Sequence, residues 1–306
     1  MNFFEIQLLG VSVYHILLYF FIYSFFGWIW ESSYVSFLQK KWVNRGFVSG
    51  PILTIYGAGA VSVYLLLKGI SSNFLLLYLG GVVVATVLEY ITAFLMELVF
   101  HMSWWDYSDK KFQLQGRICL ESSLFWGVLT LVLFYVFQPM VESLAGLLPR
   151  KAGEYLILTI SGIYLIDFSI SFVAASHLSA TLKKWNDLVE DWAVHIKDAL
   201  IPDQLQEFKE KLGAAKRYVL DVNVVKSLEL RQKELLDILE KRKEELSFLN
   251  NLDDIKGHYA EFISKVLELR KKTSRVAKRF ITAYPKMGNL TKLRKERKKK
   301  GEKKEK

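Results

Sequence analysis

Long apolar runs dominate the first 176 residues of the chain and are separated by short polar stretches. A transmembrane helix needs about 20 consecutive, mostly apolar residues, and five segments approach or reach that length. They cover about residues 13–37, 51–67, 74–100, 118–141 and 155–176. One such segment could be a buried helix of a large soluble protein, but five in succession with few charges favour a membrane domain. We therefore expect an all-α, polytopic membrane protein with about five transmembrane helices.

The pattern changes after about Leu182, where charged residues become frequent. The sequence predicts three tail helices, interrupted at Pro202 and at the pair of asparagines before residue 252. They cover about residues 183–199, 203–247 and 253–282. Leucines near helical spacing in the second helix are typical of an amphipathic helix or a short coiled coil.

The last sixteen residues, TKLRKERKKKGEKKEK, contain ten Lys and Arg and have no apolar surface to bury. Such composition predicts disorder. The chain thus divides into three expected regions: a transmembrane domain (1–178), a cytoplasmic helical tail (179–285) and a disordered polybasic C-terminus (286–306).

The net charge of +10 is distributed unevenly along the chain. Residues 1–176 contain 9 Lys and Arg against 10 Asp and Glu, whereas residues 177–306 contain 32 against 21. Lys and Arg are retained on the cytoplasmic side of a membrane, so we expect the N-terminus outside and the tail inside. The tail could bind anionic lipid headgroups or be only a solvated surface. The tail lacks an aromatic–basic motif, so we expect no nucleic-acid partner. The lipid bilayer is the expected partner of the chain.

Acidic residues within the predicted spans are the main candidates for function, because a charge at the bilayer centre costs about 2.5–3.5 kcal/mol. They are Glu31, Glu89, Glu97, Glu121 and Asp167. In the predicted topology all five lie in the cytoplasmic half or near the midplane, with Arg45 and Arg117 as the expected counter-charges. Three interpretations stay open. The groups form ion pairs that fix helix packing, or line a polar cavity open to the cytoplasm, or snorkel to the interface without a function.

Several short motifs occur in a fixed order within the first 140 residues. They are GWIWE (27–31), RGFVSGP (45–51), IYGAGA (55–60), LEY (88–90) followed by Glu97, WDYS (105–108), GRI (116–118) and SSLFWG (122–127). Over about residues 15–140 the chain thereby resembles the bacterial membrane proteins known as ABC-transporter type IV, or CmpB-type, permeases. It departs from their pattern at Thr54, usually Pro, and at Gln113 and Gln115, usually Asn. The basic tail is not part of the shared pattern.

The resemblance implies a transporter permease component in the bacterial cytoplasmic membrane, with its functional surface on the cytoplasmic side. The residues implied are Glu31, Arg45, Glu89, Glu97, Asp106 and Arg117, with Asp167, Glu121, Tyr56 and Tyr90 as additional candidates. The chain has no G-x-x-x-x-G-K-[ST] phosphate loop. A separate ATPase subunit would therefore dock on the cytoplasmic face, and a homo-oligomer is a further expected assembly.

Known enzyme signatures are absent from the sequence. It has no H-E-x-x-H zinc motif and no G-x-S-x-G nucleophile elbow, its five histidines are scattered, and Cys119 is its only cysteine. We expect no catalytic residue, metal or cofactor. Two other functions stay open: a membrane enzyme that uses paired carboxylates on a lipid or isoprenoid-type substrate, and a non-catalytic scaffold that recruits partners through its tail.

Overall fold

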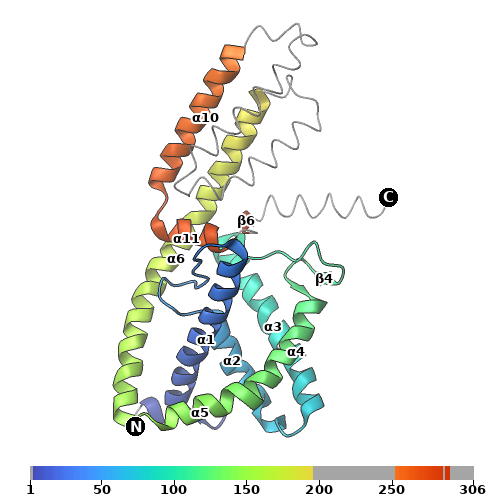
Figure 1. Cartoon of the computed structure of the whole chain (residues 1–306), viewed down its shortest axis with the longest axis vertical. Helices are drawn as coiled ribbons and strands as arrows, with labels where there is room; N and C mark the ends of the chain where they lie inside the picture. The colour runs from blue at the N-terminus through green and yellow to red at the C-terminus, as the bar shows by residue number, and fades with distance from the viewer. Residues whose placement is uncertain (1–2, 196–251, 285–286, 290–306) are drawn as a thin grey trace. The chain divides into compact units, whose positions relative to one another are not determined.

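The computed structural model describes residues 3–195, 252–284 and 287–289 (Figure 1). The chain separates into two units. Unit 1 contains Met1–Val173 and Lys286–Lys306, and unit 2 contains Ala174–Pro285. The expected tail helix at 203–247 lies outside the described residues, as does most of the polybasic C-terminus.

Unit 1 is built from long apolar helices joined by short loops. In chain order they are α1 (Val13–Gln39), α2 (Thr54–Leu67), α3 (Phe74–Phe100), α4 (Leu120–Val132), α5 (Gln138–Gly146) and the first part of α6 (Arg150–His195). A 3₁₀ turn at Lys68–Ile70 extends α2, and a π-helical turn at Leu133–Phe137 joins α4 to α5. The expected all-α fold is confirmed.

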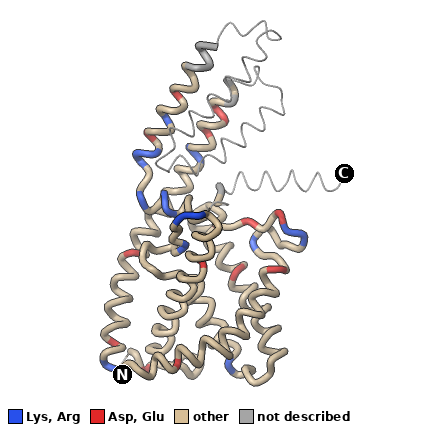
Figure 2. Tube along the Cα trace, in the orientation of Figure 1, with Lys and Arg blue, Asp and Glu red and all other residues tan. Residues whose placement is uncertain are grey.

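Four helical segments are long and apolar enough to cross a membrane: Val13–Gln39, Phe74–Phe100, Leu120–Gly146 and Arg150–Trp192. The second expected span corresponds to the shorter apolar segment Thr54–Ile70. Charged residues of unit 1 gather mainly near the two ends of these helices (Figure 2). Large apolar side chains such as Val83, Val87 and Leu98 are exposed along α3, which in a bilayer gives them contact with lipid. The chain is therefore a polytopic helical membrane protein.

Glycine brings α1 and α2 close together. A Cβ atom placed on Gly57 would lie 2.1 Å from Ser24 Oγ and 2.4 Å from the backbone oxygen of Phe20. By contrast, nothing lies within 4 Å of a Cβ placed on Gly59. Small residues in membrane helices allow such close approach, but only one of these two glycines is used for it.

Short antiparallel strand pairs shape the loops of unit 1. The strand β1 (Gln7–Leu8) pairs with β2 (Val11–Ser12), and β4 (Gln113–Leu114) pairs with β5 (Ile118–Cys119). The third pair joins β3 (Met102–Ser103) to β6 (Gly288–Asn289), two segments far apart in the sequence. Residues 288–289, within the C-terminal region expected to be disordered, therefore form a strand.

In unit 2, apolar side chains of the second part of α6 pack against the helix α10 (Leu252–Lys272), and the helix α11 (Arg275–Ala283) follows with buried apolar residues of its own. Ring contacts join Trp185 to Phe262 and Trp192 to Tyr259. The expected fifth span and the expected first tail helix are continuous in the described residues. A single helix, α6, covers both, because no Gly or Pro follows Gly162 within it.

The last expected tail helix is divided into two. Its first part, α10, ends at Lys272, and Ser274 begins α11 by accepting a hydrogen bond from the backbone N–H of Ala277 at 3.1 Å. A serine hydroxyl in this position satisfies a donor that the first helical turn leaves free. Ser274, which lies inside an otherwise helical pattern, was therefore the signal in the sequence for the start of a new helix.

Candidate functional site

A buried ion pair between described residues of unit 1 joins Glu97, near the end of α3, to Arg117, which follows the β4 strand. Arg117 Nη2 lies 2.6 Å and Nε lies 3.0 Å from the same oxygen, Glu97 Oε2. The two side chains are only 13% and 6% exposed for Arg117 and Glu97. Glu97 Oε1 is buried and has no hydrogen-bond partner among the described residues. Arg117 therefore binds only one of the two carboxylate oxygens of Glu97, and the other oxygen is a buried acceptor.

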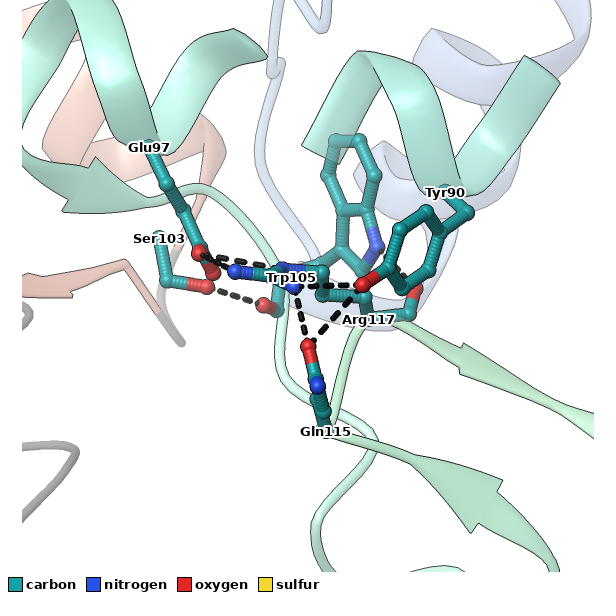
Figure 3. A network of polar contacts seen from close by, with 6 residues as sticks. All are labelled: Tyr90, Glu97, Ser103, Trp105, Gln115 and Arg117. Atoms are coloured by element: carbon teal, nitrogen blue, oxygen red, sulfur yellow. Dashed lines mark hydrogen bonds and ion pairs between the residues drawn. The ribbon is translucent and has the colours of Figure 1, made fainter. Parts of the chain in front are cut away.

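Neutral groups complete the surroundings of the Arg117 guanidinium (Figure 3). Its Nη1 donates to the Tyr90 hydroxyl at 2.9 Å and also to Gln115 Oε1. The guanidinium carbon lies 5.1 Å from the centre of the Tyr90 ring and 5.5 Å from that of Phe94. Aromatic faces attract cations at such distances, so these rings fix the guanidinium over the side of α3.

The loop backbone determines where Arg117 lies. Gln115 and Gly116 have φ values of 54° and 67°, a left-handed turn that returns the chain from β4 to β5. Trp105 Nε1 donates to the backbone oxygen of Arg117 at 2.9 Å, and Ser103 Oγ donates to the backbone oxygen of Trp105 at 2.6 Å. These contacts join the two ends of the α3–α4 loop and hold Arg117 against Glu97 (Figure 3).

A second ion pair joins Glu31, in α1, to Arg45, in the following loop. Arg45 Nε lies 3.1 Å from Glu31 Oε2, and the Tyr56 hydroxyl donates to Glu31 Oε1 at 3.1 Å. The backbone N–H of Arg45 also donates to Ser32 Oγ at 3.2 Å. Both partners are partly exposed, at 21% and 25% for the Arg45 and Glu31 side chains, so this pair is more accessible than Glu97–Arg117.

Glu89, in the middle of α3, accepts hydrogen bonds from neutral donors. They are the Tyr107 hydroxyl at 3.1 Å, the Ser122 hydroxyl at 2.9 Å and Trp126 Nε1 at 3.0 Å. Among the described residues, no Lys or Arg forms an ion pair with it. The Glu89 residue is only 7% exposed. It is therefore a buried carboxyl group surrounded by hydrogen-bond donors that carry no charge.

Aromatic contacts connect these groups. Tyr56 donates a hydrogen bond to Glu31 and Trp126 donates one to Glu89. The centres of the Tyr56 and Trp126 rings lie 6.2 Å apart. Tyr107 is joined to the Arg117 hairpin because its backbone N–H donates to the oxygen of Gly116 at 2.9 Å. Burial and the charge of Glu89 raise the pKa of Tyr107 above its usual range, so the phenol remains a hydrogen-bond donor. Three acidic groups and two arginines thus form one connected polar region, called here the Glu89 cluster (Glu31, Arg45, Glu89, Glu97 and Arg117).

The remaining candidates lie at its edge and have local roles. Asp106 accepts from the backbone N–H and the hydroxyl of Ser108, at 3.0 and 2.5 Å. Glu121 forms an exposed pair with Lys110 at 2.5 Å, and its hydrogen bond raises the pKa of Lys110. Asp167 accepts from the backbone N–H of Gly50 at 2.8 Å. Arg45 and Arg117 are thus the partners of Glu31 and Glu97, while the other three acids have partners of their own.

A further polar cluster, which joins Tyr23 of α1 to α2 and α5, was not found from the sequence. Tyr23 donates to Gln138, Gln138 Nε2 donates to Glu142 at 2.8 Å, and the Tyr64 hydroxyl donates to Glu142 at 3.4 Å. The fourth span was expected to end at residue 141, which excluded Glu142 from the acids considered. The four-residue spacing of Gln138 and Glu142 was the available signal, because such residues share a helix face.

Comparison with protein families decides the relationship of the chain. The model of the family described as "Putative ABC-transporter type IV" (ABC_trans_CmpB) matches residues 18–172, just over half of the chain. The chain belongs to the ABC_trans_CmpB family. The match contains every residue of the Glu89 cluster and extends beyond the motifs that suggested it, into α6. No curated protein and no solved structure matches the chain.

Membership in ABC_trans_CmpB, together with the apolar helices, supports a transporter component located in a membrane. The described residues include no group of three or more His, Cys, Asp or Glu side chains that could hold a metal ion. The side chains of the Glu89 cluster offer charges and hydrogen-bonding groups of their own.

Proposed function

We propose that this ABC_trans_CmpB protein is the membrane component of a transporter and that the Glu89 cluster is its ligand-binding region on the cytoplasmic side. The family supplies the transporter class. The cluster is proposed because it brings together the only acidic side chains of the described α1 and α3 with two arginines from the loops that follow them.

Glu89 carries this proposal. Glu31 and Glu97 are each neutralised by an arginine, so a role in fixing helix packing explains them. Glu89 has only neutral donors, and burying an unpaired carboxylate is costly. A group of this kind is retained at a cost in stability, which favours a role in receiving a positively charged group of a ligand or a proton. We infer that Glu89 is the recognition group of the cluster.

Metabolite and lipid profiles of cells that lack the protein test this proposal. The deletion strain would be complemented with the wild type, with Glu89→Gln, or with Glu121→Gln. The last is the matched control, because it makes the same change at an exposed carboxylate. We expect a solute to be redistributed across the membrane in the deletion strain and in the Glu89→Gln strain, but not in the control.

Membrane amounts of each variant must be equal for the comparison to hold. If wild type and Glu89→Gln restore the same profile, Glu89 is not the recognition group. A lipid that accumulates as an unprocessed precursor, with no solute redistributed, would instead support a membrane enzyme.

The proposal also requires a separate ATPase, because the chain has no phosphate-binding loop. We propose that it docks on the α3–α4 loop, where Lys110 and Lys111 are exposed. Purification in mild detergent should retain an ATPase with the wild type and with Lys151→Glu, but not with the double variant Lys110→Glu, Lys111→Glu. An ATPase absent from the wild-type preparation, or retained equally by all three, would contradict this docking site.

A further inference from the structure

The pairing of β3 with β6 brings a C-terminal segment to the loop that holds Arg117. Met102 lies opposite Asn289 and Ser103 lies opposite Gly288, in antiparallel register. Met287, just before β6, is 2% exposed, and Met102 is fully buried. The segment is therefore held by main-chain pairing and by burial of an apolar side chain, although its sequence continues directly into a polybasic stretch.

The strand β3 is flanked by packed residues other than those of β6. His101, at the end of α3, has φ of 52° and turns the chain out of the helix. Trp104, just after β3, is 4% exposed. Its ring lies 5.9 Å from the Phe100 ring and 5.7 Å from the Phe47 ring. Proteins accept an added strand at an extended segment whose main-chain groups can pair with it, and β3 pairs with β6 in this way.

Hydrogen bonds lead from this strand pair to the Glu89 cluster. Ser103, paired with Gly288, donates to the backbone oxygen of Trp105. Trp105 in turn donates from Nε1 to the backbone oxygen of Arg117, whose side chain binds Glu97. Figure 3 shows Ser103, Trp105 and Arg117 near one another in this network. Only two hydrogen bonds therefore separate the β3 strand from the ion pair of Glu97 and Arg117.

We propose that β3 is a strand-accepting edge whose occupant is residues 287–289 of the same chain, and that the docked strand holds the Arg117 loop in place. Residues 287–289, called the strap, would thereby stabilise the ion pair of Glu97 and Arg117. The strap acts on the loop whatever the cluster binds, so this inference does not depend on the transport proposal.

Disulfide trapping tests whether the strand is docked in the intact protein. Ser103→Cys and Gly288→Cys would be combined in a Cys119→Ala background. Directly opposed strand residues lie at Cα separations that a disulfide can bridge. The matched control replaces Ser103→Cys by Lys111→Cys, an exposed position of the same loop outside β3. We expect oxidation to link residues 103 and 288 at least about tenfold faster than residues 111 and 288. Equal rates, or no link between 103 and 288, would overturn the docking.

Two truncations test whether the strap holds the loop. A chain that ends at Asn289 keeps β6 and loses the polybasic stretch, whereas a chain that ends at Tyr284 loses both. In the second chain alone, we expect amide hydrogen exchange of residues 103–117 and tryptic cleavage at Lys110 and Lys111 to be about tenfold faster, because local opening becomes easier. Unchanged exchange in α1 and α3 would show that the truncated chain is folded. Equal rates in the two truncations would overturn the proposal.

Discussion

The ion pair of Glu97 and Arg117 leads to a prediction about stability. Both side chains are largely buried, and removing one partner of such a pair typically costs about 3–5 kcal/mol because the other charge is left uncompensated. We therefore expect Arg117→Gln to lower the midpoint of thermal unfolding in detergent, measured by circular dichroism. Removing both charges, in Arg117→Gln with Glu97→Gln, should restore most of the loss.

The exposed pair of Lys110 and Glu121 is the control for this effect. It joins the same loop to α4 but has side chains that are 47% and 73% exposed. Exposed pairs contribute little to stability because water and salt screen them, so Lys110→Gln should change the midpoint little. A double variant at Glu97 and Arg117 as unstable as Arg117→Gln alone would show that burial of an unpaired charge is not the cause.

Tyr107 gives a pH dependence whose direction follows from its surroundings. Burial and the negative charge of Glu89 raise its pKa, whereas an unfolded tyrosine ionises at about 10. The folded protein therefore holds this proton more tightly, and the resulting stability is complete below pH about 10 and is lost as the pH rises past the folded pKa. The absorbance difference between wild type and Tyr107→Phe should show a phenol that ionises above pH 10.

Glu89→Gln tests the cause of that shift. It keeps the size of the side chain and removes the charge, so Tyr107 should ionise at a lower pH in this variant than in the wild type. Ionisation at pH 10 in the wild type would mean that Tyr107 is exposed to water and does not donate to Glu89.

Among the elements, contact between α1 and α2 depends on Gly57. Any side chain at this position meets the backbone of Phe20 as well as Ser24, and backbone cannot move aside without shifting a helix. Gly57→Ala should therefore destabilise the protein in detergent by about 1–3 kcal/mol. Gly59→Ala, on the same helix and facing open space, should be neutral or stabilising by up to about 1 kcal/mol. Equal effects of the two changes would contradict the close packing.

The sequence predicts helices and counter-charges better than loop contacts. Apolar length alone identified the helices, and the sequence suggested Arg45 and Arg117 as counter-charges for the acidic residues without assigning either arginine to a particular carboxylate. The structure pairs them with Glu31 and Glu97. The partners of Glu89 could not be predicted, because Tyr107, Ser122 and Trp126 reach it only once α3 and α4 are packed together. The strand β6 was missed for a related reason. Its pairing is made of main-chain groups, which leave no side-chain pattern in the sequence.

For the whole molecule, the topology depends on whether α2 crosses the membrane. With its 3₁₀ extension it covers Thr54–Ile70, a length of about 27 Å against a hydrocarbon core of about 30 Å. Lys68, at its end, can reach the headgroups with its flexible side chain, and the bilayer can thin slightly around a short helix. We therefore propose that α2 crosses, which gives five spans, an outer N-terminus and a cytoplasmic tail.

Labelling of single cysteines in a Cys119→Ala background tests this topology. Ser72→Cys lies between α2 and α3, Lys111→Cys lies between α3 and α4, and Lys271→Cys lies at the end of α10. With five spans, a membrane-impermeant maleimide should label only residue 72 in intact cells and all three after lysis. If α2 turned back instead, the positions after it would change sides. Residue 72 would then be protected and residues 111 and 271 labelled in intact cells. That outcome would place the Glu89 cluster across two sides of the membrane and contradict a ligand site open to the cytoplasm.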